Sequence, residues 1–269
     1  MSKTLIPLLP EQVRTCVGKW EVFLKRIHIC PLMTTYPYGK WSFCLPKRRI
    51  LLRLIAVTND KLCVEQLVKT LFEIVPYVDR VILRERNKTV DELEQLLSCL
   101  RERDFPMEKC VVHGNPKLAM NYHIPTVQLP GSNDELKVYR ERYPMIQFGK
   151  SIHSIEEAVK AEYEGAQYAL YGHIFPTACK EGVPSRGTKE VARIVKDISI
   201  PLYVIGGILP EHIPHLKAIG VSGIAVMSTI FEHAQPAMMA KKYHESIYKE
   251  VTNHDENHYV KWPATNVFQ

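Results

Sequence analysis

Short apolar runs, many of them rich in β-branched residues, alternate with helical patterns from residue 52 onward. This alternation is typical of β-strands that are each followed by a helix returning the chain to the next parallel strand. The pattern predicts strands at Leu52–Val57, Arg80–Leu83, Cys110–His113, Thr126–Leu129, Ile146–Phe148, Tyr168–Tyr171, Leu202–Ile205 and Gly223–Val226. Eight such units are the number in a closed TIM (β/α)8 barrel, so we expect an α/β fold of this type.

The intervening helices are predicted from apolar residues three and four positions apart. Two such sets are Leu93, Leu96, Leu97 and Leu100, and Val191, Ile194, Val195 and Ile198. Ser154 is placed to cap the helix that follows it, with Glu157 at the capping-box position. Pro210 favours the first turn of a further helix.

Residues 51–250 are therefore predicted to form one barrel domain within the 269-residue chain. Residues 1–50 show no strand–helix pattern, and we expect them to be an N-terminal extension that is poorly ordered or loosely packed. Residues 251–269 are expected to be a polar C-terminal tail.

The formal charge of +6 is concentrated in the extension. Residues 1–50 hold nine Lys or Arg and two Glu, a net charge of +7, so residues 51–269 sum to −1. We expect no nucleic-acid partner, because the barrel portion is nearly neutral. No apolar stretch approaches the roughly 18 residues of a membrane span, so no membrane association is expected. Seven irregularly spaced cysteines favour reduced thiols and a cytoplasmic location.

The connection from Ile174 to Thr188 is the longest that the pattern predicts between a strand and a helix. It contains Pro176, Gly182, Pro184 and Gly187, which favour irregular structure. Long loops at the carboxyl face of a barrel often close over substrate, so this segment is a candidate lid. The alternative is a surface loop that is merely mobile.

A candidate phosphate site follows the last two predicted strands. Gly206 and Gly207 come after the seventh strand, and their lack of side chains would let backbone N–H groups approach an anion. Met227 and Ser228 come after the eighth strand. Since the loops after strands seven and eight hold a phosphate in many barrels, we predict that these four residues bind one.

Candidate catalytic and binding residues follow other strands. His173 comes after the sixth strand, and an imidazole can take up and release a proton near neutral pH. Arg84 and Arg86 follow the second strand and could bind a carboxylate or phosphate; the alternatives are a solvated loop or an ion pair with Glu85. The predicted rim is completed by His113, Gln128 and Ser151.

Several segments, in order, resemble the thiamine phosphate synthase superfamily and, more closely, its TenI-like branch, the thiazole tautomerases. The resemblance rests on Val81–Lys88, Val127–Pro130, Gly149–Ser154, Tyr171–Lys180, Ile200–Ile208 and Gly223–Ser228. It implies a barrel enzyme of thiamine biosynthesis, and it suggests a homodimer. It also implies that Thr177 and Lys180 contact the substrate together with Ser151.

The two branches differ at the rim, and the sequence can be compared with both. Synthases bind magnesium with an Asn-Asp pair after the third strand and an Asp after the fourth, where this chain has His113-Gly114 and Asn133. Synthases also have Gly-Pro where this chain has Gly172-His173. Since histidine transfers protons and proline does not, the exchange favours the tautomerase.

The resemblance therefore implies an isomerase that needs no metal or other cofactor. Its reaction converts 2-(2-carboxy-4-methylthiazol-5(2H)-ylidene)ethyl phosphate to the aromatic 2-(2-carboxy-4-methylthiazol-5-yl)ethyl phosphate, with His173 as acid and base. The substrate carboxylate would be bound by Arg84, Arg86 or Lys180. The alternatives are thiamine phosphate synthase and a non-enzymatic regulatory protein on the same barrel. Whether a second residue shares the proton transfer stays open.

Overall fold

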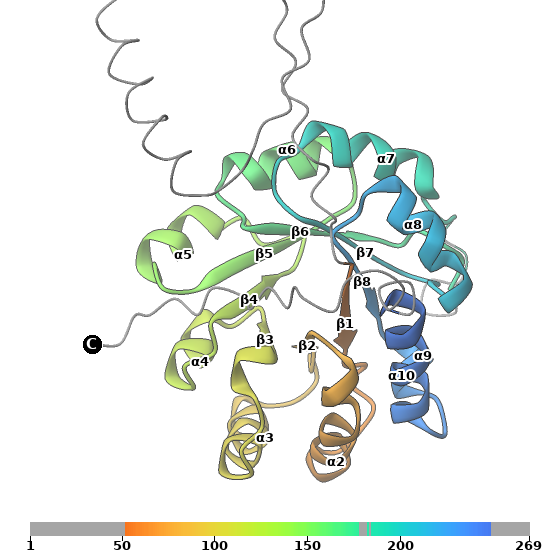
Figure 1. Cartoon of the computed structure of the whole chain (residues 1–269). Coiled ribbons are helices and arrows are strands. Elements are labelled where there is room, and N and C mark those ends of the chain that lie inside the picture. Colours follow the sequence, from red (N-terminus) through yellow and green to blue (C-terminus); the bar gives the residue numbers. More distant parts are fainter. Residues whose placement is uncertain (1–51, 178–181, 183, 249–269) are drawn as a thin grey trace, which may run out of the picture. The chain divides into compact units, whose positions relative to one another are not determined.

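The computed structural model describes residues 52–177, 182 and 184–248 and shows a closed barrel of parallel strands (Figure 1). The strands follow chain order around the barrel, and the first pairs with the eighth through Arg53↔Gly223 and Ala56↔Val226. The predicted TIM barrel is thereby confirmed. The predicted extension (1–50) and tail (251–269) lie outside the described residues.

The strands agree closely with the apolar runs of the sequence. They are β1 (Arg53–Val57), β2 (Arg80–Leu83), β3 (Cys110–His113), β4 (Thr126–Leu129), β5 (Gln147–Ile152), β6 (Tyr168–Gly172), β7 (Leu202–Ile205) and β8 (Gly223–Val226). The main difference is β5, which begins one residue later than predicted and continues to Ile152. Its polar second half remains a strand because it pairs with both neighbours, as in Leu129↔Lys150 and Ser151↔Leu170.

Helices surround the barrel in Figure 1. They are α2 (Val64–Ile74), α3 (Val90–Glu102), α4 (Pro116–Asn121), α5 (Leu136–Arg142), α6 (Ile155–Tyr163), α7 (Thr188–Asp197), α8 (Ile213–Ile219), α9 (Ser228–Phe231) and α10 (Pro236–Tyr248). Short 3-10 helices add η1 (Val75–Tyr77), η2 (Met107–Lys109) and η4 (Pro210–His212). The apolar sets predicted for α3 and α7 face the core, with Leu96, Leu97 and Leu100 buried in α3.

The predicted helix starts are correct in part. The Ser154 hydroxyl accepts a hydrogen bond from the Glu157 N–H and so caps α6, as expected. The Glu157 carboxylate, however, accepts from the N–H of His153 rather than from that of Ser154, so the expected capping box is not formed there. Pro210 begins the 3-10 helix η4, which leads into α8, rather than beginning an α-helix itself.

Apolar side chains fill the inside of the barrel in a core separate from the one beneath the helices. The inner core comprises Ile55, Val57, Ile82, Val111, Tyr168, Leu170, Tyr203 and Ala225. Because alternate residues of a strand face the same side, residues two positions further along point into the mouth of the barrel. Because Ile82 and Val111 face the inner core, we expect Arg84 and His113, two positions further along their strands, to point into the mouth.

No helix in the described part of the chain is both long enough and apolar enough to cross a membrane.

Candidate functional site

The predicted site residues meet at the carboxyl face of the barrel, because all eight strands run parallel and each candidate lies at or after a strand end. This is the face on which TIM-barrel enzymes place their active sites. Thr177 lies in the described part of the connection after β6. Lys180 lies outside the described residues, as do 178–181 and 183 of the predicted lid.

His173 packs against Gly206, and Phe175 and Pro176, two and three positions further along, pack against Gly207. The pairing of β6 with β7 continues past both strands, since the Ile174 N–H donates to the Ile205 carbonyl over 3.1 Å and the Phe175 N–H to the Gly206 carbonyl over 3.0 Å. A Cβ atom on Gly206 would lie 2.4 Å from Cβ of His173. The backbone and Cβ of His173 therefore lie against the first glycine of the predicted phosphate cradle.

The same packing gives the glycine pair a structural reason that the sequence did not reveal. A Cβ atom on Gly207 would lie 2.2 Å from the Pro176 carbonyl oxygen. Both glycines also have positive φ, +107° at Gly206 and +63° at Gly207, which side chains disfavour. The pair is needed to admit the chain after β6, whether or not its N–H groups also contact an anion.

The strand end that carries His173 is fixed on two sides. His153 Nδ1 donates to the Gly172 carbonyl over 3.1 Å, from the loop after β5. The Tyr171 hydroxyl donates to the Glu190 carboxylate of α7 over 2.7 Å. Burial, followed by this hydrogen bond, raises the pKa of Tyr171 above its ordinary value, so it remains a neutral donor.

The long connection after β6 returns to the residues from which it leaves. The Arg186 N–H donates to the His173 carbonyl over 3.1 Å, and the Gly187 N–H donates to the Ile174 carbonyl over 3.0 Å. The Arg186 guanidinium also donates to the His153 carbonyl over 2.6 Å. His173, whose preceding peptide bond is cis, is 8% exposed in this enclosure.

The three cationic residues after β2, Arg84, Arg86 and Lys88, lie in two different surroundings. Lys88 Nζ lies 2.5 Å from the Glu85 carboxylate and 3.8 Å from that of Asp60, and the side chains of Lys88 and Glu85 are 9% and 1% exposed. The ion pair considered as an alternative for this run is therefore formed by Lys88. Arg84 and Arg86 instead line a cavity.

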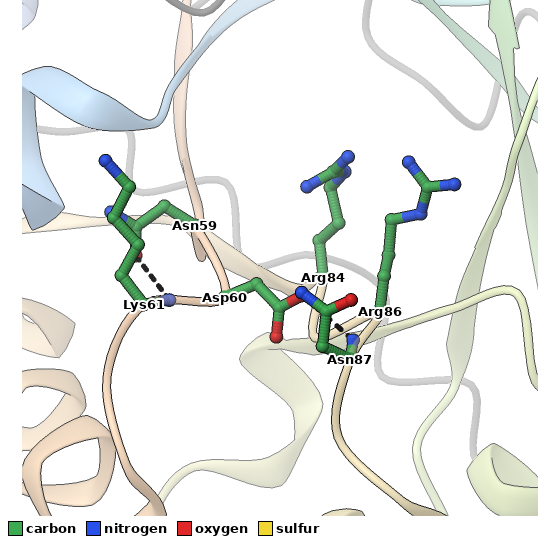
Figure 2. Close-up of a pocket in the computed structure, with 6 residues that line it drawn as sticks. All are labelled: Asn59, Asp60, Lys61, Arg84, Arg86 and Asn87. Atoms are coloured by element: carbon green, nitrogen blue, oxygen red, sulfur yellow. Dashed lines mark hydrogen bonds between the residues drawn. The ribbon is translucent and has the colours of Figure 1, made fainter.

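That cavity has a volume of about 420 Å³ and lies at the ends of β1 and β2 (Figure 2). Its lining comprises Asn59, Asp60, Lys61, Arg84, Arg86 and Asn87. Figure 2 shows the side chains of Lys61, Arg84 and Arg86 extending in the same direction. Lys61 also pairs with Glu232 over 2.9 Å at the exposed edge. Such a concentration of cations suits an anionic group.

Asn59, Asp60 and Lys61 were missed by the sequence reasoning. Each follows β1, so the rule that identified Arg84 and Arg86 after β2 would also have found them. Their short polar run carries no motif of its own.

A row of polar residues crosses the mouth along β3, β4 and β5. His113 is paired in register with Gln128. Gln128 Nε2 donates to Ser151 Oγ over 3.0 Å and to the Leu129 carbonyl over 3.3 Å. Gln128 is 1% exposed, and within the described chain its Oε1 has no hydrogen-bond partner. Because a carbonyl can only accept, the contact with Leu129 O fixes which end of the amide is Nε2.

His113 lies in surroundings that oppose its protonation. Burial, followed by the positive charges of Arg84 and Arg86, lowers the pKa of His113 to about 4. The imidazole is therefore neutral at pH 7 in the ligand-free protein. The charges of both guanidinium groups, which follow the neighbouring strand β2, therefore act on His113.

The remaining two predicted residues follow β8. Met227 packs against the inner core of the barrel, and Ser228 is the first residue of α9. Strands β7 and β8 are paired through Ile205↔Ala225, so the loops that follow them start side by side. The structure thus brings Met227 and Ser228 next to the loop that carries Gly206 and Gly207.

The side chains at the mouth do not fit the magnesium site that the resemblance implies for synthases. Among the described residues, no group of three or more His, Cys, Asp or Glu side chains is arranged to hold a metal. Glu85 pairs with Lys88 over 2.5 Å, and Asp60, which lines the cavity, is a single carboxylate 3.8 Å from the same ammonium group. The positions at which the resemblance places the magnesium ligands hold His113, Gly114 and Asn133, which lack the carboxylates that such a site needs.

Comparison with known proteins identifies related sequences. Residues 54–230 match the family model described as thiamine monophosphate synthase. A thiamine-phosphate synthase of Caldivirga maquilingensis is 39% identical over 110 residues, which are 41% of this chain and 52% of that protein. One from Pyrococcus horikoshii is 38% identical over 104 residues, 39% of this chain and 50% of that protein. The chain thus spans about half the length of these curated relatives.

Solved structures match over a longer part of the chain. A thiamine phosphate pyrophosphorylase from Pyrococcus furiosus has a TM-score of 0.63 and 27% identity, covering 76% of this chain and 98% of its own. A 3-hexulose-6-phosphate synthase from Salmonella typhimurium has a TM-score of 0.60 and 14% identity, covering 74% and 99%. The second likeness shows the shared fold alone.

Proposed function

Since the chain belongs to the family described as thiamine monophosphate synthase, we propose that it acts in thiamine biosynthesis as a thiazole tautomerase, an isomerase. The observation that carries this proposal is the contact between His173 and Gly206. It supports a proposal in which His173 transfers the proton and the adjoining loop holds the phosphate. A thiazole phosphate held by its phosphate would then have its ring close to the imidazole.

The proposed reaction needs only one kind of chemistry. A base removes the proton from ring C2, the electron pair shifts through the ring, and a proton is added to the exocyclic carbon. Substrate and product are isomers, so the reaction consumes no electrons or co-reactant. His173 can accept the first proton and supply the second, and its enclosure limits exchange with bulk water.

The substrate's two anionic groups are assigned to different sides of the mouth. We assign the phosphate to Gly206, Gly207, Met227 and Ser228, because the loops after β7 and β8 start from paired strands. We assign the carboxylate to Arg84 and Arg86, whose guanidinium groups line the cavity after β2. Ser151 and Thr177 are proposed as further contacts, as is Lys180, which lies outside the described residues.

A second candidate is thiamine phosphate synthase, which the names of the relatives favour. A synthase must stabilise the charge that develops on a departing pyrophosphate, ordinarily with magnesium. The positions at issue hold His113, Gly114 and Asn133 in this chain. This difference in side-chain chemistry is why we place the tautomerase first.

The test is a direct assay of aromatisation. The dihydrothiazole carboxylate phosphate is supplied without magnesium, and ultraviolet absorbance is followed for wild type and His173→Ala. Loss of the acid/base should reduce the rate by about 10²-fold or more. His215→Ala is the matched control, because His215 is an exposed histidine on α8 that contacts Thr188; its rate should match wild type.

Two outcomes would contradict the proposal. A wild-type rate no faster than buffer would exclude the tautomerase. Magnesium-dependent coupling of a pyrimidine pyrophosphate to the thiazole phosphate, without tautomerisation, would establish the synthase instead.

A further inference from the structure

We propose that His113 takes up a proton when an anionic group of the ligand binds Arg84 and Arg86, so that the imidazolium becomes a third cation holding that group. The proposal adds a binding residue and a proton linkage to the mouth of the barrel. It concerns anion binding and does not depend on which reaction follows.

The register of the strands places the groups together. β2 pairs with β3 through Leu83↔Val112, so the residues that follow, Arg84 and His113, leave neighbouring strand ends. Ile82 and Val111 belong to the inner core, and alternation directs Arg84 and His113 to that same side. We therefore expect an anion bound by the Arg84 guanidinium to act on the charge of His113, as Arg84 itself does.

The charges facing His113 explain why it is neutral before an anion binds. From the loop after β2 it meets Arg84 and Arg86, and their charges add to the effect of burial in lowering the pKa of His113. From β4 it meets the uncharged amide of Gln128. Glu85 is paired with Lys88 over 2.5 Å, and Asp60, which lines the cavity with both arginines, lies 3.8 Å from Lys88 and accepts from the Asn87 N–H. A bound anion would offset the two cations and supply the opposite charge that an imidazolium requires.

Gln128 provides a second, independent observation. Its Oε1 is a buried acceptor without a hydrogen-bond donor among the described residues, and its register partner on β3 is His113. A neutral imidazole has one N–H, whereas an imidazolium has two. Protonation would let His113 donate to an anion with one nitrogen and to its polar neighbours with the other. A neutral imidazole could donate either to the anion or to Gln128 Oε1, whereas an imidazolium could donate to both.

The energetic consequence is a pH-dependent affinity for anions. In the free protein the pKa of His113 is about 4. A bound-state value near the ordinary histidine value of about 6.5 would couple binding to proton uptake, which is partial at pH 7 and approaches one proton between about pH 4 and pH 6.5. Affinity for an anion at Arg84 and Arg86 should then rise by about 20-fold from pH 7 to pH 5.

The first measurement is a titration of ¹⁵N-labelled histidine side chains by NMR, with and without excess sulfate at constant ionic strength. Sulfate is the probe because it does not itself titrate near neutral pH. The His113 signal is assigned by its loss in His113→Asn. We expect sulfate to raise the pKa of His113 by about one unit or more, while the exposed His215 and His233 serve as internal references.

Two variants test the cause. Arg84→Gln with Arg86→Gln should abolish the sulfate response, yet His113 should stay largely neutral at pH 7, because burial is the first cause of its low pKa. Gln128→Leu should reduce the sulfate-induced rise. An unchanged His113 pKa in excess sulfate overturns the proposal. An equal rise in the double arginine variant also overturns it, because the anion would then act from elsewhere.

Discussion

At the scale of single residues, the most consequential contact is the one between Gly206 and His173. Only an absent side chain at Gly206 leaves room for the His173 Cβ atom, and only a glycine adopts φ of +107° without strain. The position of the proposed acid/base therefore depends on a residue of the neighbouring loop. A change at Gly206 should reach the chemistry through His173.

Gly206→Ala is expected to displace His173. The tautomerisation rate of the folded variant should therefore fall, beyond what its lower free energy of unfolding would explain. The added methyl would lie 2.4 Å from His173 Cβ, and overpacking of this kind costs about 1–3 kcal/mol. Urea denaturation and the aromatisation assay would separate the two effects. Gly220→Ala is the matched control, since Gly220 also has positive φ but its added Cβ would make an ordinary 3.5 Å contact. Equal rate losses in both variants would contradict the argument.

At the scale of elements, β5 is both a strand of the barrel and the carrier of a residue of the candidate site. Its second half carries Ser151, which accepts from Gln128, and it contains Gly149, whose place inside the barrel is filled by the Tyr168 ring. The ring of Tyr168 in turn packs edge-on against Tyr203, with centroids 5.4 Å apart. A glycine in β5 thus admits an aromatic pair that spans β6 and β7.

Gly149→Ala should destabilise the barrel, because the new methyl would lie 2.0 Å from the Tyr168 ring. We expect a loss of about 1–3 kcal/mol or more in the free energy of unfolding, measured with urea. In a Tyr168→Leu background the same change should cost much less, since the ring is gone. An equal cost in both backgrounds would show that the ring is not the cause.

Strand ends could be predicted from the sequence wherever the apolar run and the strand coincide, as in β2 and β7. They could not be predicted for β5, because the pairing that keeps Lys150 and Ser151 in a strand comes from β4 and β6. The general position of the candidate site followed from the same strand ends. The sequence did not show which cation of the run pairs with Glu85, because that depends on how the loop after β2 folds beside Asp60 of the loop after β1.

At the scale of the whole barrel, α10 packs against β1, α2 and η1 from the first unit and against η4 and α9 from the last units. Tyr243 of α10 is fully buried and its hydroxyl donates to the Ile208 carbonyl over 2.7 Å, just after the glycine pair. His244 Nδ1 donates to the Tyr77 carbonyl over 3.1 Å, at the end of the first strand–helix unit. Helix α10 is therefore hydrogen-bonded both to the first strand–helix unit and to the loop of the proposed phosphate site.

Tyr243 should contribute stability that is lost at high pH. Burial raises its pKa from 10.0 to about 12, so the folded protein holds this proton more tightly than the unfolded chain does. The contribution is complete below about pH 10 and disappears as the pH rises to about 12. Tyr243→Phe should lower stability at pH 7 by about 1 kcal/mol or more, because the Ile208 carbonyl loses its donor.

Denaturation of wild type and Tyr243→Phe across this alkaline range would check the linkage. The stability difference between them should shrink as the pH rises. A constant difference would mean that the hydroxyl is not the titrating group.

The place of α10 has a practical consequence for anyone who trims this protein. The family match ends at residue 230, before α10 begins at Pro236. A fragment cut at that boundary would retain all eight strands but would leave the apolar surface of α2 uncovered where α10 packs. We expect such a fragment to aggregate, and its inactivity would be no measure of the catalytic residues that it still contains.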